Sequence, residues 1–110
     1  MSKHLQPSPE QLGQLSALYN KGRFAQLERR TKKLLSDYPS SPLLYEILGA
    51  ALAGQNKLAA AAESCRAILR LQPENASAHS NLGFALREIG QLEDAVESCR
   101  RAVALKPDHA

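Results

Sequence analysis

Cys65 and Cys99 are the first residues whose chemistry needs an interpretation, because each lies in an identical Glu-Ser-Cys-Arg tetrapeptide, at 63–66 and 97–100. Two thiols could form a disulfide or supply ligands to zinc. Zinc usually takes four ligands, often in close pairs such as Cys-x-x-Cys, and the sequence holds no such pair. Equivalent positions on stacked helix pairs lie about 10 Å apart, whereas a disulfide needs Cα atoms about 4.4–6.8 Å apart. We therefore predict that each cysteine fills a buried position as a small hydrophobic residue, with no metal or other cofactor.

The histidines are the other candidates for catalysis. They are His4, His79 and His109, and neither His4 nor His109 has a partner nearby in the sequence. A catalytic histidine needs an orienting group and a nucleophile beside it. The sequence also lacks Gly-x-Ser-x-Gly, His-Glu-x-x-His and a phosphate-binding loop. We predict that the chain is not an enzyme.

A basic segment could bind phosphates or acidic partners. Arg29, Arg30, Lys32 and Lys33 flank Thr31 and hold most of the basic excess in a chain whose net charge is only +3. A nucleic-acid site of this kind usually adds aromatic side chains on which bases stack, and none accompanies this segment. We therefore favour a solvated outer helix face and disfavour nucleic acid as a partner.

The elements that would position these residues recur along the chain. Residues 42–75 and 76–109 agree at twelve positions when they are aligned with a shift of 34 residues. A fixed period of this length indicates stacked supersecondary units that bury apolar faces against their neighbours. Leucine spacing, Ser-Pro starts and Gly or Pro ends predict an all-α chain of six helices, at 9–21, 24–37, 42–54, 58–71, 76–89 and 92–105.

The repeated residues resemble the tetratricopeptide repeat (TPR). The resemblance rests on Leu82-Gly83, Ala85, Leu86, Gly90, Ala95, Ala102 and Pro107, with matches one period earlier. It implies a right-handed solenoid of three antiparallel helix pairs, in which Gly83 and Ala95 let helices approach and Leu82, Leu86 and Leu92 fill the space between them. It also implies that His79 packs at a repeat junction. We expect one domain at 8–110, with repeats at 8–41, 42–75 and 76–109, after a disordered lead-in at 1–7.

The resemblance also implies a binding surface. In this family the first helices line a concave groove and the second helices form the convex back, so we expect a protein or peptide partner in the groove. The positions that carry over as partner-binding residues are Leu12, Ser16, Tyr19, Asn20, Glu46, Ala50, Ser80, Asn81, Phe84, Arg87 and Glu88.

Two comparisons within the family narrow the choice of partner. Chaperone-binding members carry a clamp of Lys and Asn at groove positions that hold Leu12, Ser16, Ile47, Ser80 and Phe84 here, so that mode of binding is not expected. In the O-linked N-acetylglucosamine transferase family, an asparagine before Leu-Gly holds peptide backbone. Asn81 matches one such position, while Gly13 and Ile47 occupy the earlier ones.

Two functions follow from the resemblance. The first is an interaction scaffold that binds a peptide or a partner helix. The alternative is a substrate-presenting N-terminal region of a larger glycosyltransferase or sulfotransferase, since Leu- and Ala-rich repeats of bacterial style often precede such enzymes. No helix follows the third repeat in the sequence, so we expect Leu86, Val96 and Val103 to be partly exposed. Either the chain is a fragment of a longer protein, which we favour, or a second copy covers this face, and we expect self-association through it.

The lack of long apolar segments and the number of cysteines indicate the cellular compartment of the protein. No run of residues is long enough to span a membrane, and the N-terminus lacks the apolar core of a signal peptide. Two cysteines without an export signal favour a reducing compartment. The sequence therefore predicts a cytoplasmic protein.

Overall fold

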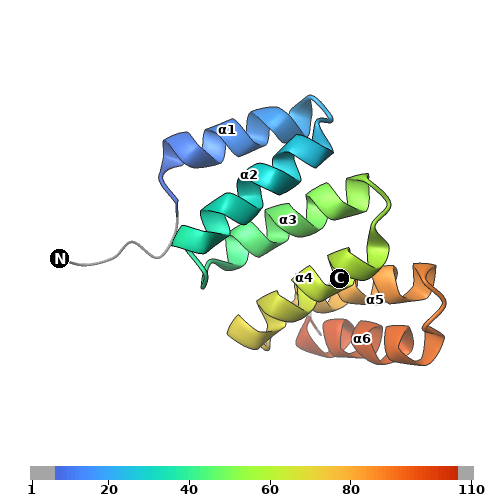
Figure 1. Ribbon diagram of the computed structural model, residues 1–110. Helices are drawn as coiled ribbons and strands as arrows, with labels where there is room; N and C mark the ends of the chain where they lie inside the picture. Colours follow the sequence, from blue (N-terminus) through green and yellow to red (C-terminus); the bar gives the residue numbers. More distant parts are fainter. Residues whose placement is uncertain (1–6, 107–110) are drawn as a thin grey trace.

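The computed structural model describes residues 7–106, which form six α-helices and no strand (Figure 1). The helices are α1 (Pro9–Asn20), α2 (Phe24–Asp37), α3 (Pro42–Gly54), α4 (Leu58–Leu71), α5 (Ala76–Glu88) and α6 (Leu92–Leu105). The predicted boundaries are confirmed, except that α1 and α5 each end one residue earlier than expected. The expected lead-in lies outside the described residues except for Pro7, which is buried. His4, Pro107 and His109 also lie outside them.

Side chains cap the first helix of each pair. Ser8 makes a capping box with Gln11, in which the Ser8 Oγ accepts from the Gln11 backbone N–H at 3.1 Å. Ser41 and Asn75 accept in the same way from the residues three positions later. Such a cap satisfies a backbone donor that the helix itself cannot, and is worth about 1 kcal/mol. The starts of α1, α3 and α5 are therefore fixed by local sequence.

The turn inside each pair places one residue in the left-handed region of the backbone. Gly22 and Gly90 have φ of 71° and 88°, and Asn56 has φ of 61° at the equivalent position of the middle pair. A side chain at such φ costs about 1–2 kcal/mol, which glycine avoids and asparagine partly offsets through local hydrogen bonds. The same tight turn therefore forms three times from two residue types.

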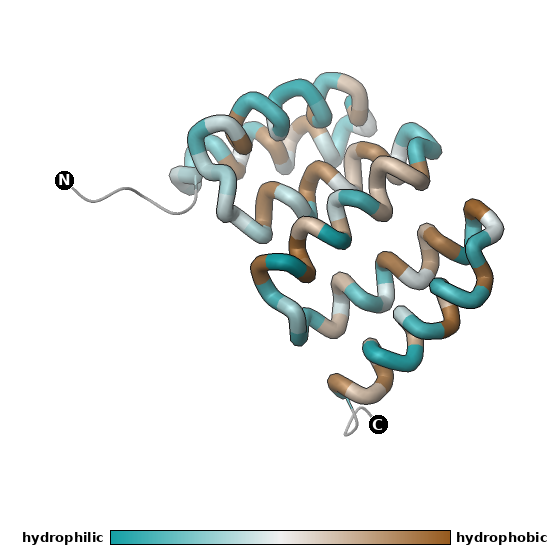
Figure 2. The backbone as a smooth tube through the Cα atoms, turned by 60° about the horizontal axis from the view of Figure 1, so that its bottom comes forward, coloured by the Kyte–Doolittle hydropathy of each residue, from teal (hydrophilic) through white to brown (hydrophobic). Residues whose placement is uncertain are grey.

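Each helix packs against the next one along the chain, so the three pairs make one continuous stack. Between the first and second pairs the buried core holds Leu15, Leu27, Leu44 and Ala51. Between the second and third pairs it holds Ala62, Cys65, Leu82, Ala85, Leu86 and Ala95. Figure 2 shows hydrophobic and hydrophilic residues alternating along the helices, as expected when each helix buries one side.

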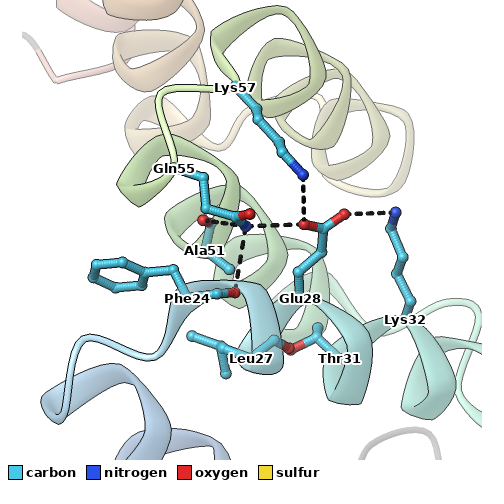
Figure 3. A network of polar contacts seen from close by, with 8 residues as sticks. All are labelled: Phe24, Leu27, Glu28, Thr31, Lys32, Ala51, Gln55 and Lys57. Carbon is cyan, nitrogen blue, oxygen red and sulfur yellow. Dashed lines mark hydrogen bonds and ion pairs between the residues drawn. The ribbon is translucent and has the colours of Figure 1, made fainter.

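A network of polar contacts lies beside the apolar core of the junction between the first two pairs (Figure 3). Gln55, at the end of α3, donates to the Glu28 carboxylate of α2 at 2.9 Å and to the Ala51 carbonyl at 3.0 Å. Lys57 and Lys32 pair with the same carboxylate at 3.2 and 2.8 Å. One period later the positions of Glu28 and Gln55 hold Ala62 and Ile89, so the second junction is apolar there. Polar contacts thus help to set how α1 and α2 sit against α3.

The last pair leaves an apolar surface open, which we call the C-terminal face. Val96 and Val103 are 50% and 71% exposed, as the sequence predicts. The exposure predicted for Leu86 is wrong, because Leu86 is only 2% exposed and packs toward Ala62 and Cys65, as a residue between the helices would. The position predicted for Leu92 is also wrong, because Leu92 was expected between the helices but is 60% exposed on this face.

Candidate functional site

The surface formed by α1, α3 and α5 contains three connected depressions, which together we call the groove. The first, of about 380 Å³, lies between α1 and α3. The second, of about 300 Å³, lies over α3, α4 and α5, and the third, of about 280 Å³, lies at the N-terminal ends of α3 and α5. Glu46 lines all three, while Ala50 joins the first to the second. The depressions therefore form one continuous surface across three repeats.

The structure brings most of the predicted groove residues together. Leu12, Ser16, Tyr19, Asn20, Glu46 and Ala50 line the first depression. Glu46, Ala50, Asn81 and Phe84 line the second. The α3 wall of the second depression combines Tyr45 and Glu46 with the small residues Gly49, Ala50 and Ala53. In the first depression, Tyr19 packs edge-to-face on Phe24, with ring centroids 5.7 Å apart.

Three predicted residues lie elsewhere. Ser80 and Arg87 line a wider hollow of about 860 Å³ on the C-terminal face, and Phe84 lines both that hollow and the groove. Glu88 lines none of these depressions and pairs with Arg87, with 3.5 Å between the Nε and carboxylate oxygen. The Arg87 guanidinium lies 5.4 Å from the Phe84 ring centroid, a cation–π contact at the end of the groove.

Sequence reasoning missed the part that α4 plays. It assigned second helices to the convex back, yet the floor of the second depression includes Leu58, Ala61, Ser64, Cys65 and Ile68 of α4. The facing positions on α3 are Gly49, Ala50 and Ala53, whose small side chains leave α4 uncovered. The run of small residues on α3 was the available signal.

The two cysteines differ although their sequence positions are equivalent. Both are free, Cys65 is buried as predicted, and Cys99 is exposed, contrary to the prediction. α5 covers Cys65, whereas no described helix follows α6 to cover Cys99. Burial raises the pKa of the Cys65 thiol, against a smaller lowering effect of Arg66, so Cys65 is held as the unreactive thiol.

His79 occupies the predicted junction position rather than a catalytic arrangement. Its side chain is 8% exposed, and Nε2 lies 2.9 Å from the Pro73 carbonyl oxygen. A carbonyl oxygen only accepts, so Nε2 carries the proton of this hydrogen bond. Within residues 7–106 no cluster of three or more His, Cys, Asp or Glu side chains is arranged to hold a metal ion.

The basic segment of α2 lies away from the groove. Arg29, Arg30, Lys32 and Lys33 are exposed, while Thr31 between them is buried and donates to the Leu27 carbonyl at 2.7 Å. None of these residues lines the groove, and Lys32 is paired with Glu28. These positions match the solvated outer face that the sequence favours. No helix between residues 7 and 106 combines the length and the apolar character needed to cross a bilayer.

The architecture and sequence of this chain are similar to those of known repeat proteins. The family model described as tetratricopeptide repeat matches residues 12–74 and again residues 48–110. No curated protein matches the chain by sequence.

Solved structures share the fold at low identity. The first TPR of Spaghetti (RPAP3), bound to an HSP90 peptide, has a TM-score of 0.87 and 20% identity, covering 97% of this chain and 85% of that one. The Sgt2 TPR domain from Aspergillus fumigatus gives 0.84 and 19%, covering 98% and 74%. MamA from Desulfovibrio magneticus RS-1 gives 0.83 and 19%, covering 90% and 56%. The chain thus spans little more than half of such MamA chains. The six stacked helices of residues 7–106 and the two family matches show that the chain belongs to the tetratricopeptide-repeat family.

Proposed function

We propose that this chain is a protein-interaction module that binds an extended peptide segment or a partner helix in the groove, without catalysis of its own. The observation that carries the proposal is the continuity of the groove, because Ala50 and Glu46 join depressions that span α1, α3 and α5. Apolar walls with a few polar groups are typical of peptide-binding grooves. The peptide bound to RPAP3 supports this class of ligand by fold-level analogy.

The experiment blocks the groove at its centre without changing charge. Short random peptides displayed on phage are selected on the wild-type chain, and their affinities are measured by fluorescence anisotropy. Ala50→Gln places a longer neutral side chain where the first two depressions meet, so we expect at least about a fivefold loss of affinity. Ala59→Gln is the matched control, since Ala59 is an exposed α4 residue outside the groove. Equal affinity for both variants would show that the peptides bind elsewhere.

The alternative role uses the same groove to present protein substrates to an attached glycosyltransferase or sulfotransferase. The mass of the native gene product separates the two. A band near the 12.0 kDa of this chain, detected by immunoblot with an antibody to residues 8–106, supports a free-standing adaptor. A much larger band directs the search to whatever region is attached, and its purified form would then be assayed for transfer to a groove-bound peptide.

A further inference from the structure

Glu46 is the charged residue of the groove. It lines all three depressions, and among residues 7–106 no Lys, Arg, Asp or other Glu lines any of them. Its side chain is exposed, and within residues 7–106 it forms no ion pair. The equivalent positions of the other repeats hold Leu12 and Ser80, so this charge is specific to the middle of the groove.

Apolar side chains lie beside Glu46 in the first and second depressions, whereas the third is lined mainly by polar side chains, among them Gln72 and Ser77. Leu43, Ile47 and Ala50 lie beside it in the first depression, and Ala53 and Ile68 lie in the second. Apolar walls lower the local dielectric, which strengthens attraction to a cation and raises the cost of burying an anion beside the carboxylate. A ligand that covers Glu46 without a compensating positive charge would leave that carboxylate desolvated and unpaired.

The positive charge of the rest of the chain does not cancel this preference. The exposed basic residues Arg29, Arg30 and Lys33 lie on α2, which contributes no residue to the groove. Charges separated by more than about 8 Å in water are largely screened at physiological salt. Within residues 7–106, Glu46 is therefore the one charged side chain that lines the three depressions, while Arg87 lies at the end of the groove against Phe84.

We propose that the groove selects an apolar segment that carries one basic side chain, with Glu46 pairing with its ammonium or guanidinium group and apolar side chains seated in the depressions on either side. Acidic segments are rejected. This inference rests on the proposed function and names the chemistry of its partner. Glu46 is the specificity-determining residue, while Ala50 and its neighbours form the walls against which the apolar side chains of the ligand pack.

The test compares peptide selections on three forms of the chain. Peptides from the random library are selected on the wild type, on Glu46→Gln and on Glu97→Gln, which removes the same charge from an exposed α6 position outside the groove. We expect Lys or Arg at a fixed position among apolar residues in the wild-type and Glu97→Gln selections, and loss of that preference with Glu46→Gln.

A double-mutant cycle then measures the pair directly. Replacing the basic residue of the best peptide by Gln should weaken binding to the wild type about threefold to tenfold. The same replacement should leave binding to Glu46→Gln unchanged, because the partner carboxylate is already absent. The best peptide with Glu in place of its basic residue serves as a negative probe and should not bind the wild-type chain.

The outcomes separate this inference from the proposed function. Peptides that bind in the groove, as judged by Ala50→Gln, but show no basic preference or no coupling to Glu46 overturn the inference alone. Tight binding of the Glu-substituted peptide in the groove would also overturn it. Peptides whose affinity is unchanged by Ala50→Gln bind outside the groove, and they overturn the proposed function itself.

Discussion

Tyr45 and His79 lie 34 residues apart at equivalent repeat positions, and each donates a hydrogen bond to a proline carbonyl that recurs with the same period. The Tyr45 hydroxyl lies 3.3 Å from the Pro39 carbonyl oxygen, and His79 Nε2 lies 2.9 Å from that of Pro73. Two chemically different side chains thus tie the start of a first helix to the end of the preceding second helix. The contact orients α3 and α5, which carry most of the groove.

This contact predicts which substitutions His79 tolerates. His79→Tyr keeps a donor at a position where the middle repeat already uses tyrosine, so we expect a small change in stability. His79→Phe removes the donor and leaves the Pro73 carbonyl without this partner, which should cost about 1 kcal/mol. Urea unfolding followed by circular dichroism measures both. If the His79→Tyr and His79→Phe variants are equally stable, the hydrogen bond to Pro73 does not contribute to stability.

Gly49 and Gly83 each follow a leucine at equivalent positions of α3 and α5, and we expect alanine to have opposite effects at the two positions. A Cβ at Gly49 would lie 3.5 Å from the Ser64 Cβ, an ordinary contact, so Gly49→Ala should stabilise by about 0.5–1 kcal/mol. At Gly83 it would lie 2.7 Å from the Cys99 Sγ and 3.3 Å from the Ala95 carbonyl oxygen. Gly83→Ala should therefore destabilise by about 1 kcal/mol, within the range for overpacking. Adding Cys99→Ala should recover part of that loss in the same unfolding assay, and no recovery would contradict this contact as its cause.

The Glu28 carboxylate predicts an acid-sensitive junction. Hydrogen bonding to Lys32, then to Gln55, lowers the pKa of Glu28 from its ordinary 4.5 to about 2, with a smaller opposing effect of burial. A lowered folded-state pKa means that the charged form stabilises the fold above about pH 4.5 and that this stabilisation is lost as the pH falls toward 2. Because Lys32 and Lys57 are half-exposed, we expect a loss of about 1–2 kcal/mol. Unfolding free energies measured across this range should fall more steeply for the wild type than for Glu28→Gln, and parallel curves would contradict the assignment.

Phe84 and Arg87 predict a binding defect without a folding defect. Both side chains are exposed, Phe84 by 52%, so Phe84→Ala with Arg87→Glu should leave helicity intact. Loss of the exposed ring should weaken groove-selected peptides by at least about fivefold. Val103→Ala, which changes only the C-terminal face, is the matched control in the anisotropy assay. Unchanged affinity of the double variant would move the interface away from this end of the groove.

The C-terminal face predicts weak self-association. Its exposed Leu92, Val96 and Val103 form an apolar surface of the kind that drives contacts between copies at high concentration. Val103→Lys adds a positive charge beside Arg87 and Arg100 and should prevent this association. Sedimentation velocity over a range of concentrations should show a rising mass for the wild type and a constant monomer mass for the variant. A wild type that stays monomeric would contradict self-association through this face.

Local chemistry made the helices predictable from the sequence alone. Ser8, Ser41 and Asn75 cap the helices that follow them, and Gly22 and Gly90 end the helices before them through interactions within a few residues. The 34-residue period then predicts antiparallel pairs, because each unit needs a neighbour to bury its apolar side. The same period placed most of the groove residues in a row, since equivalent positions of stacked repeats face the same way.

Residues at equivalent repeat positions differ in their surroundings, and only the tertiary structure reveals these differences. Cys65 and Cys99 share a tetrapeptide, yet Cys65 is buried under α5 and Cys99 is exposed. Gly49 and Gly83 share a position, yet only the latter has a sulfur atom where a Cβ would lie. The Glu28–Gln55 contact joins residues 27 apart, which no local pattern reveals. Sequence determines short-range geometry, whereas burial, close approach and pairing depend on which neighbour packs against each face.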